Sequence, residues 1–161
     1  MPVCRQAHNR LAFEFIVAVG SQLGSSCQGY TSHMRVHIPA TGLYTYPGVV
    51  IACGKPQFLD AIQDTLLNPT LIVEVLSPST EAYNRGRKFE HYRSLDSLRE
   101  YLLISSERIS VDLFTRQADG KWLLSSADRI DASLDLQSVG ATLALAGLYE
   151  GIELTAATPA P

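Results

Sequence analysis

The chain has 161 residues, of which 46% are hydrophobic and 18% are charged. This length suffices for one domain, and the apolar content excludes disorder as the main state. The 13 Lys and Arg residues against 16 Asp and Glu give a net charge of −3. That balance argues against a basic surface that follows nucleic acid over a whole face, but it leaves room for a local basic site.

The sequence predicts a protein of the cytoplasm. No run approaches 18 consecutive apolar residues, and the first residues lack a cationic-then-apolar signal pattern, so we expect no membrane segment. The cysteines are Cys4, Cys27 and Cys53, far apart in the sequence. An odd number without close pairs favours reduced thiols over disulfides. No Cys or His pair shares zinc-ligand spacing with a second pair.

Hydrophobic periodicity predicts helices and strands in the first half of the chain. Apolar residues recur at helical spacing over about 5–23, which indicates a helix. Residues 30–38 alternate between apolar and polar, as in a strand with one face in water. Unbroken apolar runs at 49–53, 70–77 and 101–104 are typical of strands buried on both faces, with a loop over 54–69.

The second half adds a helix over about 85–95, with Asn84 as its N-cap. Residues 109–115 and 122–124 flank Asp119-Gly120, which signals a hairpin with a two-residue turn. We expect a short closing helix near 145–149 and a flexible tail at 155–161. This order predicts a single α/β domain over 1–154, a mixed sheet with a helix on each side.

One charged residue interrupts a predicted buried strand. Glu74 lies in the apolar run 71–76, where a lone ionised carboxylate costs several kcal/mol unless it is paired or binds a cation. It is therefore in a structural ion pair with Lys88 or an arginine, or at a strand end exposed to water, or a catalytic or metal-binding carboxylate. Arg85, Arg87 and Lys88 lie at the start of the next predicted helix, where cations oppose the helix dipole unless an anion is near. A strand carboxylate and a helix lysine suit metal-assisted phosphodiester hydrolysis.

Three stretches carry a family resemblance: 35–47, which ends in Tyr46-Pro47; 68–83, which reads NPTLIVEVLSPSTEAY; and 85–95. Together they closely resemble the Uma-two family of putative restriction endonucleases, and the likeness extends from about His8 through Glu153. The resemblance implies a restriction-endonuclease-like mixed sheet flanked by helices, with an added C-terminal β-hairpin. It also implies a metal-dependent endonuclease that hydrolyses DNA phosphodiester bonds with Mg²⁺ or Mn²⁺ at a PD-(D/E)XK type of site.

Carried over by position, the resemblance makes Glu74 a catalytic residue and metal ligand, and Lys88 a catalytic residue. The family's aspartate after Tyr-Pro is missing, because this chain has Gly48 there. A lone Glu74 should bind magnesium weakly or not at all unless another residue compensates, and Glu14 and His33 are the candidates.

Three functional hypotheses follow. The first is an endonuclease impaired or rewired by the change at position 48. The second is an inactive pseudo-nuclease that binds nucleic acid or a protein partner, and the third is a decayed copy. The nucleic acid would be DNA by resemblance, and a homodimer would suit cleavage of both strands.

Overall fold

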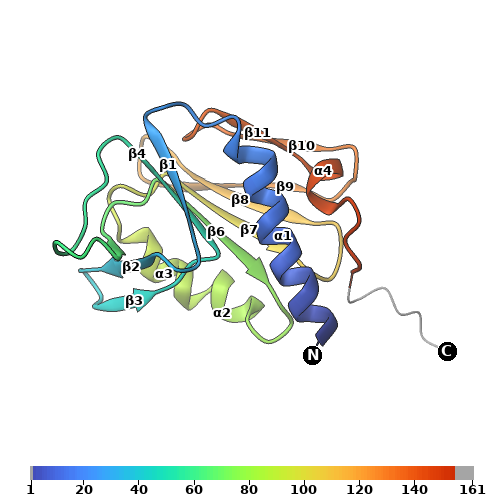
Figure 1. Ribbon diagram of the computed structural model, residues 1–161, viewed down its shortest axis with the longest axis horizontal. Coiled ribbons are helices and arrows are strands. Elements are labelled where there is room, and N and C mark those ends of the chain that lie inside the picture. Colours follow the sequence, from blue (N-terminus) through green and yellow to red (C-terminus); the bar gives the residue numbers. More distant parts are fainter. Residues whose placement is uncertain (1, 155–161) are drawn as a thin grey trace.

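The computed structural model describes residues 2–154, and their side chains from residue 6 onward; the predicted tail at 155–161 lies outside this range. Its centre is a six-stranded mixed sheet in the order β1-β4-β6-β7-β8-β9 (Figure 1). Neighbouring strands are antiparallel except β6 and β7, which are parallel. The strands are β1 (Cys27–Thr31), β4 (Val49–Cys53), β6 (Leu71–Leu76), β7 (Glu100–Ser105), β8 (Val111–Arg116) and β9 (Trp122–Ala127).

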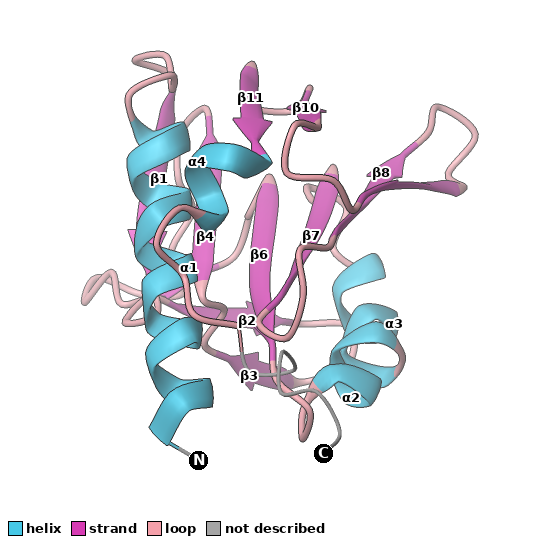
Figure 2. Ribbon diagram, turned by 90° about the vertical axis from the view of Figure 1, so that its right-hand side faces the viewer, coloured by secondary structure: helices cyan, strands magenta, loops and turns pink. Residues whose placement is uncertain are grey.

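Helices cover both faces of this sheet, as the sequence predicted. Helix α1 (Pro2–Gly20) packs Leu11, Phe15 and Val19 against one face, where α4 (Leu145–Tyr149) also lies. The short helices α2 (Glu81–Arg85) and α3 (Arg87–Arg93) lie on the other side of the strands (Figure 2), and Phe89 and Tyr92 of α3 join the second core. The three runs predicted as buried strands are β4, β6 and β7, and every residue of β6 and β7 is buried.

The single strand predicted over residues 30–38 is wrong. The chain turns at residues 32–34, so that β1 joins the large sheet and β2 (Arg35–Ile38) joins a small one with β3 (Leu43–Thr45) and β5 (Thr65–Leu66). The alternation of apolar and polar residues continues through the turn, and no glycine or proline marks it. Strands β3 and β5 and the hairpin of β10 (Ser133–Leu136) and β11 (Ala141–Ala144) were not predicted.

The predicted start of the helix over 85–95 is also wrong. Asn84 is buried inside α2 and is not an N-cap; Gly86 separates α2 from α3 and caps the latter without a side-chain bond. The carbonyl of Asn84 accepts a hydrogen bond of 2.9 Å from the Tyr101 hydroxyl, so tertiary packing holds Asn84 inside. The predicted α4 is confirmed.

The C-terminal part contains the predicted hairpin, but its turn differs. The backbone N–H of Gln117 donates to the carbonyl of Lys121, 2.7 Å away, so three residues rather than two form the loop. Gly120 closes it with φ of 86°, the left-handed conformation that three-residue hairpin loops place at this position.

The prediction of reduced thiols is wrong for two of the cysteines. Cys27 and Cys53 lie directly opposite each other on the antiparallel strands β1 and β4, with Cα atoms 4.0 Å apart, and form a disulfide. Twenty-six positions of sequence separate them, so only the strand register, which the sequence does not show, brings them together. The cytoplasmic location stays a prediction. Within the described residues, no helix has the length and apolar character needed to cross a membrane.

Candidate active site

Glu74 lies in the middle of the sheet, on β6, with 6% of its surface exposed. The antiparallel register pairs Val49 of β4 with Val73, so Gly48, just before β4, lies opposite Glu74. The backbone N–H of Gly48 donates to Oε1 of Glu74 over 3.4 Å. Residues directly opposite in antiparallel strands point to the same face, so a side chain at position 48 would stand beside the glutamate.

Helix α3 supplies two partners for the same carboxylate. The Lys88 ammonium lies 2.6 Å from Oε2 of Glu74, and both side chains are largely buried. One turn later, the Tyr92 hydroxyl donates to Oε2 over 2.9 Å and also contacts the hydroxyl of Thr45 on β3. Since Lys88 and Tyr92 are four residues apart, they lie on one face of the helix. The sequence-predicted pair of Glu74 and Lys88 is thus brought together.

The contacts around Glu74 compensate its negative charge. Burial, and then the negative charge of Glu74, raise the pKa of Tyr92 well above its usual value, so its hydroxyl keeps the proton that it donates. The carboxylate therefore has one cation and two hydrogen-bond donors around its two oxygens. Such pairing is what allows a charge to remain in a core, and removal of either partner leaves an uncompensated charge.

The residues present do not fit a divalent metal ion. No group of three or more His, Cys, Asp or Glu side chains is placed to hold a metal within the part of the chain that the structure describes. Glu14 pairs with Arg10 over 3.3 Å on α1, which covers the opposite face of the sheet. His33 is exposed in the turn between β1 and β2. Neither candidate for compensation is brought to Glu74.

The backbone at position 48 has limited space for a side chain. A Cβ built there would lie 3.2 Å from the carbonyl oxygen of Val73, close enough that the neighbouring strand must move by a few tenths of an ångström. A carboxylate at this position would therefore face Glu74 at the cost of a small local shift.

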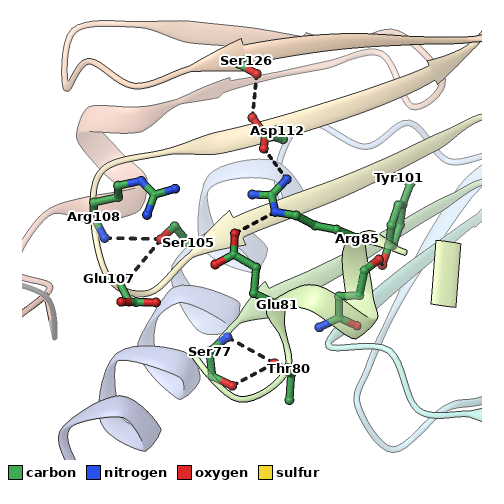
Figure 3. A network of polar contacts seen from close by, with 11 residues as sticks. Ser77, Thr80, Glu81, Arg85, Tyr101, Ser105, Glu107, Arg108, Asp112 and Ser126 are labelled. Carbon is green, nitrogen blue, oxygen red and sulfur yellow. Dashed lines mark hydrogen bonds and ion pairs between the residues drawn. The ribbon is translucent and has the colours of Figure 1, made fainter. Parts of the chain in front are cut away.

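The cations predicted near an anion do not all belong to this site. Arg85 binds Glu81 at 2.7 Å and Asp112 of β8 at 2.6 Å, and Ser126 donates to the same aspartate (Figure 3). Burial lowers the pKa of Arg85, but its hydrogen bonds to the two carboxylates outweigh this effect and raise the pKa overall. This second network ties α2 to the sheet, and Lys88 is the cation on Glu74.

Sequence reasoning missed Tyr92, Thr45 and the Gly48 amide as partners of the site. The position of Tyr92 on the face of Lys88 was visible in the helical spacing. Its role as a donor was not, because it depends on how α3 crosses the sheet.

Comparison with known proteins gives the context of this cluster. The model of the Uma2 family, described as putative restriction endonuclease, matches residues 1–147. An uncharacterized protein of Synechocystis sp. is 39% identical over 129 residues, 80% of this chain and 66% of the relative. A second uncharacterized protein of that organism is 35% identical, over 73% of this chain and 67% of its own length. The chain thus spans about two thirds of these relatives.

A solved structure shares the fold. The crystal structure of a putative nuclease belonging to DUF820 from Anabaena variabilis superposes with a TM-score of 0.73 at 15% sequence identity. The match covers 91% of this chain and 82% of the other. The architecture of this chain is therefore shared with that structure.

Proposed function

Because this chain belongs to the Uma2 family of putative restriction endonucleases, we propose that it is a DNA endonuclease of metal-dependent ancestry whose cleavage is impaired by Gly48. The observation that carries this proposal is the contact of 2.6 Å between the Lys88 ammonium of α3 and the Glu74 carboxylate of β6. Together with the family, that pair supports a catalytic ancestry for Glu74 and Lys88.

The chemistry left to this chain is that of one carboxylate and one ammonium. Lys88 can bind a phosphate oxygen and offset negative charge on it, because an ammonium carries three donors and Glu74 takes only part of them. Magnesium or manganese would supply the remaining positive charge and activate water in an intact site. A lone Glu74 whose oxygens already accept bonds from Gly48, Tyr92 and Lys88 offers little to either ion.

A second candidate function is an inactive pseudo-nuclease that binds nucleic acid without cutting it. The same saturation of Glu74 favours this candidate, since a fully paired carboxylate needs no metal to remain buried. The two candidates share the DNA partner and differ in whether any metal-dependent cutting survives.

Binding and cleavage by the natural chain test the proposal. Fluorescence anisotropy of a labelled DNA duplex, in chelator and over a salt series, should show binding that weakens with salt. If Lys88 contacts a phosphate, Lys88→Met should weaken binding and reduce the salt slope by about 1. A matched control is Lys121→Met, because Lys121, directly after the loop between β8 and β9, has a side chain that is 85% exposed.

Cleavage is read from nicking of a supercoiled plasmid with Mg²⁺ or Mn²⁺. The impaired enzyme should cut weakly, and Glu74→Ala should remove that activity. Binding without any cutting would select the pseudo-nuclease. Absence of salt-dependent binding to DNA would contradict both candidates.

A further inference from the structure

Helix α1 carries two apolar faces, and among the described residues only one of them packs into the core. Leu11, Phe15 and Val19 enter the core, whereas Phe13, Ile16 and Val17 are 60%, 37% and 56% exposed. With Gly20, the exposed residues follow the spacing i, i+3, i+4, i+7 of a single helical stripe. A helix that is apolar around most of its circumference is expected to be covered on both sides.

This stripe lies beside an open edge of the large sheet. Strand β1 is the terminal strand of the order, next to α1 in the view of Figure 2. A groove of about 240 Å³ runs between the two, lined by Ile16 and Gly20 of the helix and by Gly29 and Thr31 of the strand, among others. Within residues 2–154 no strand pairs with the outer side of β1.

The free edge has none of the features that usually prevent edge-to-edge pairing. Its sequence, CQGYT, contains no charged residue and no proline. The disulfide from Cys27 to Cys53 fixes the strand to β4, so the edge is held in extended form. Such an edge is a ready template for another strand.

The backbone groups of this edge are complementary to themselves. The carbonyl of Ile51 bonds Thr70 on the β6 side, so Gly29, which lies opposite Ile51, points its own N–H and C=O away from β4. By the same alternation, the N–H of Thr31 and the C=O of Cys27 also point outward. The two remaining outward groups are already used: the N–H of Cys27 donates to Gly24, and the C=O of Thr31 accepts from Met34.

Antiparallel pairing about Gly29 matches these groups in pairs. The N–H and C=O of Gly29 would exchange bonds with the partner's Gly29, and the N–H of Thr31 would donate to the C=O of the partner's Cys27. The groups that are already used, on Cys27 and Thr31, would face each other. We propose that a second copy of this chain pairs at β1, making one continuous sheet across a two-fold axis with the α1 stripes packed together.

The two-fold symmetry of this pairing brings the two α1 helices together. A two-fold axis through a hydrogen-bonded antiparallel pair runs perpendicular to the sheet, so both α1 helices stay on the same face and meet across the edge. The proposed contact combines two lengths of chain. Helix α1 has 19 residues and is about 28 Å long, and β1 has 5 residues and is about 17 Å long. The fraction of dimer should therefore rise with protein concentration.

Sedimentation velocity over a concentration series tests the proposal, with the disulfide intact. The natural chain should pass from monomer to dimer, and Phe13→Glu and Val17→Glu should each raise the dissociation constant at least about tenfold by placing a charge in the interface. Gly29→Pro removes an outward N–H, which an edge strand tolerates, and should have the same effect.

The matched control is Leu124→Glu on β9, the opposite edge of the sheet, where Leu124 is 51% exposed. It should leave the dissociation constant unchanged, and thermal unfolding checks that each variant folds. If Gly29→Pro does not fold, the two helix variants decide. A natural chain that is monomeric at every concentration overturns the proposal, as does a dimer that only Leu124→Glu disrupts.

Discussion

Restoring a carboxylate at position 48 should create a divalent-cation site, and this effect can be measured without any nuclease assay. Residue 48 lies opposite Glu74, so in the variant Gly48→Asp the Cβ atom of the new aspartate and that of Glu74 would be about 4.5–5.5 Å apart. That spacing lets two carboxylates share one ion with ligand distances of about 2.1 Å. The natural chain, with one carboxylate there, should show no comparable site.

The expected magnitudes follow from the same geometry. Two unit charges about 5 Å apart repel by about 3 kcal/mol at an effective dielectric constant near 20, and Lys88 offsets part of this. The close approach to the Val73 carbonyl adds a small steric cost. In chelator, Gly48→Asp should therefore lower the free energy of unfolding by about 1–3 kcal/mol. A cation at about 100 times its dissociation constant should restore about 2.7 kcal/mol.

Urea unfolding in chelator and in Mn²⁺ or Mg²⁺ measures this difference. Gly48→Asn is the matched control, because it fills the same space without charge and should not respond to the cation. The reasoning is refuted if Gly48→Asp is insensitive to the cation, or if the response survives the addition of Glu74→Gln.

Three further predictions concern stability. Lys88→Met should lower the free energy of unfolding by about 3–5 kcal/mol, because it leaves Glu74 buried without its cation; a loss below about 1 kcal/mol in chemical denaturation would contradict a tight pair. Replacing Cys27 and Cys53 together by Ser opens a loop closed over 26 positions and should cost about 3.5 kcal/mol, and dithiothreitol should destabilise the natural chain but not this variant. Burial raises the pKa of Tyr149 from 10.0 to about 12, so the stability that its protonated hydroxyl contributes is full below pH 10 and is lost as the pH rises from 10 to 12. Tyr149→Phe should flatten the dependence of the free energy of unfolding on pH in that range, and an unchanged slope would contradict this prediction.

Much of the central sheet could be predicted because its strands are buried on both faces. Such strands are short unbroken apolar runs, and β4, β6 and β7 all have this form. In helix α1 the apolar residues recur at helical spacing, but the residues of its exposed stripe follow the same spacing. Sequence alone therefore could not show which apolar face enters the core.

The elements that were missed depend on tertiary contacts. The turn between β1 and β2 has no glycine or proline. The break between α2 and α3 falls at Gly86, next to the buried Asn84, whose carbonyl accepts a hydrogen bond from the Tyr101 hydroxyl. The disulfide depends on the register of β1 against β4, which periodicity does not determine.

The site was predictable in part for a clear physical reason. Glu74 is conspicuous because a charge in an apolar strand needs a partner, and the resemblance pointed to Lys88. The contribution of Tyr92 depends on the crossing of α3 over β6, which places its hydroxyl 2.9 Å from the carboxylate.

The central claim is that Gly48 disables an otherwise intact arrangement of Glu74 and Lys88. Plasmid nicking with Mg²⁺ or Mn²⁺ by Gly48→Asp, compared with the natural chain and with Gly48→Asp combined with Glu74→Ala, tests it most directly. The account predicts that Gly48→Asp cuts well above the natural chain and that Glu74→Ala abolishes this gain. Equal activity of Gly48→Asp and the natural chain, or a gain that persists without Glu74, would contradict it.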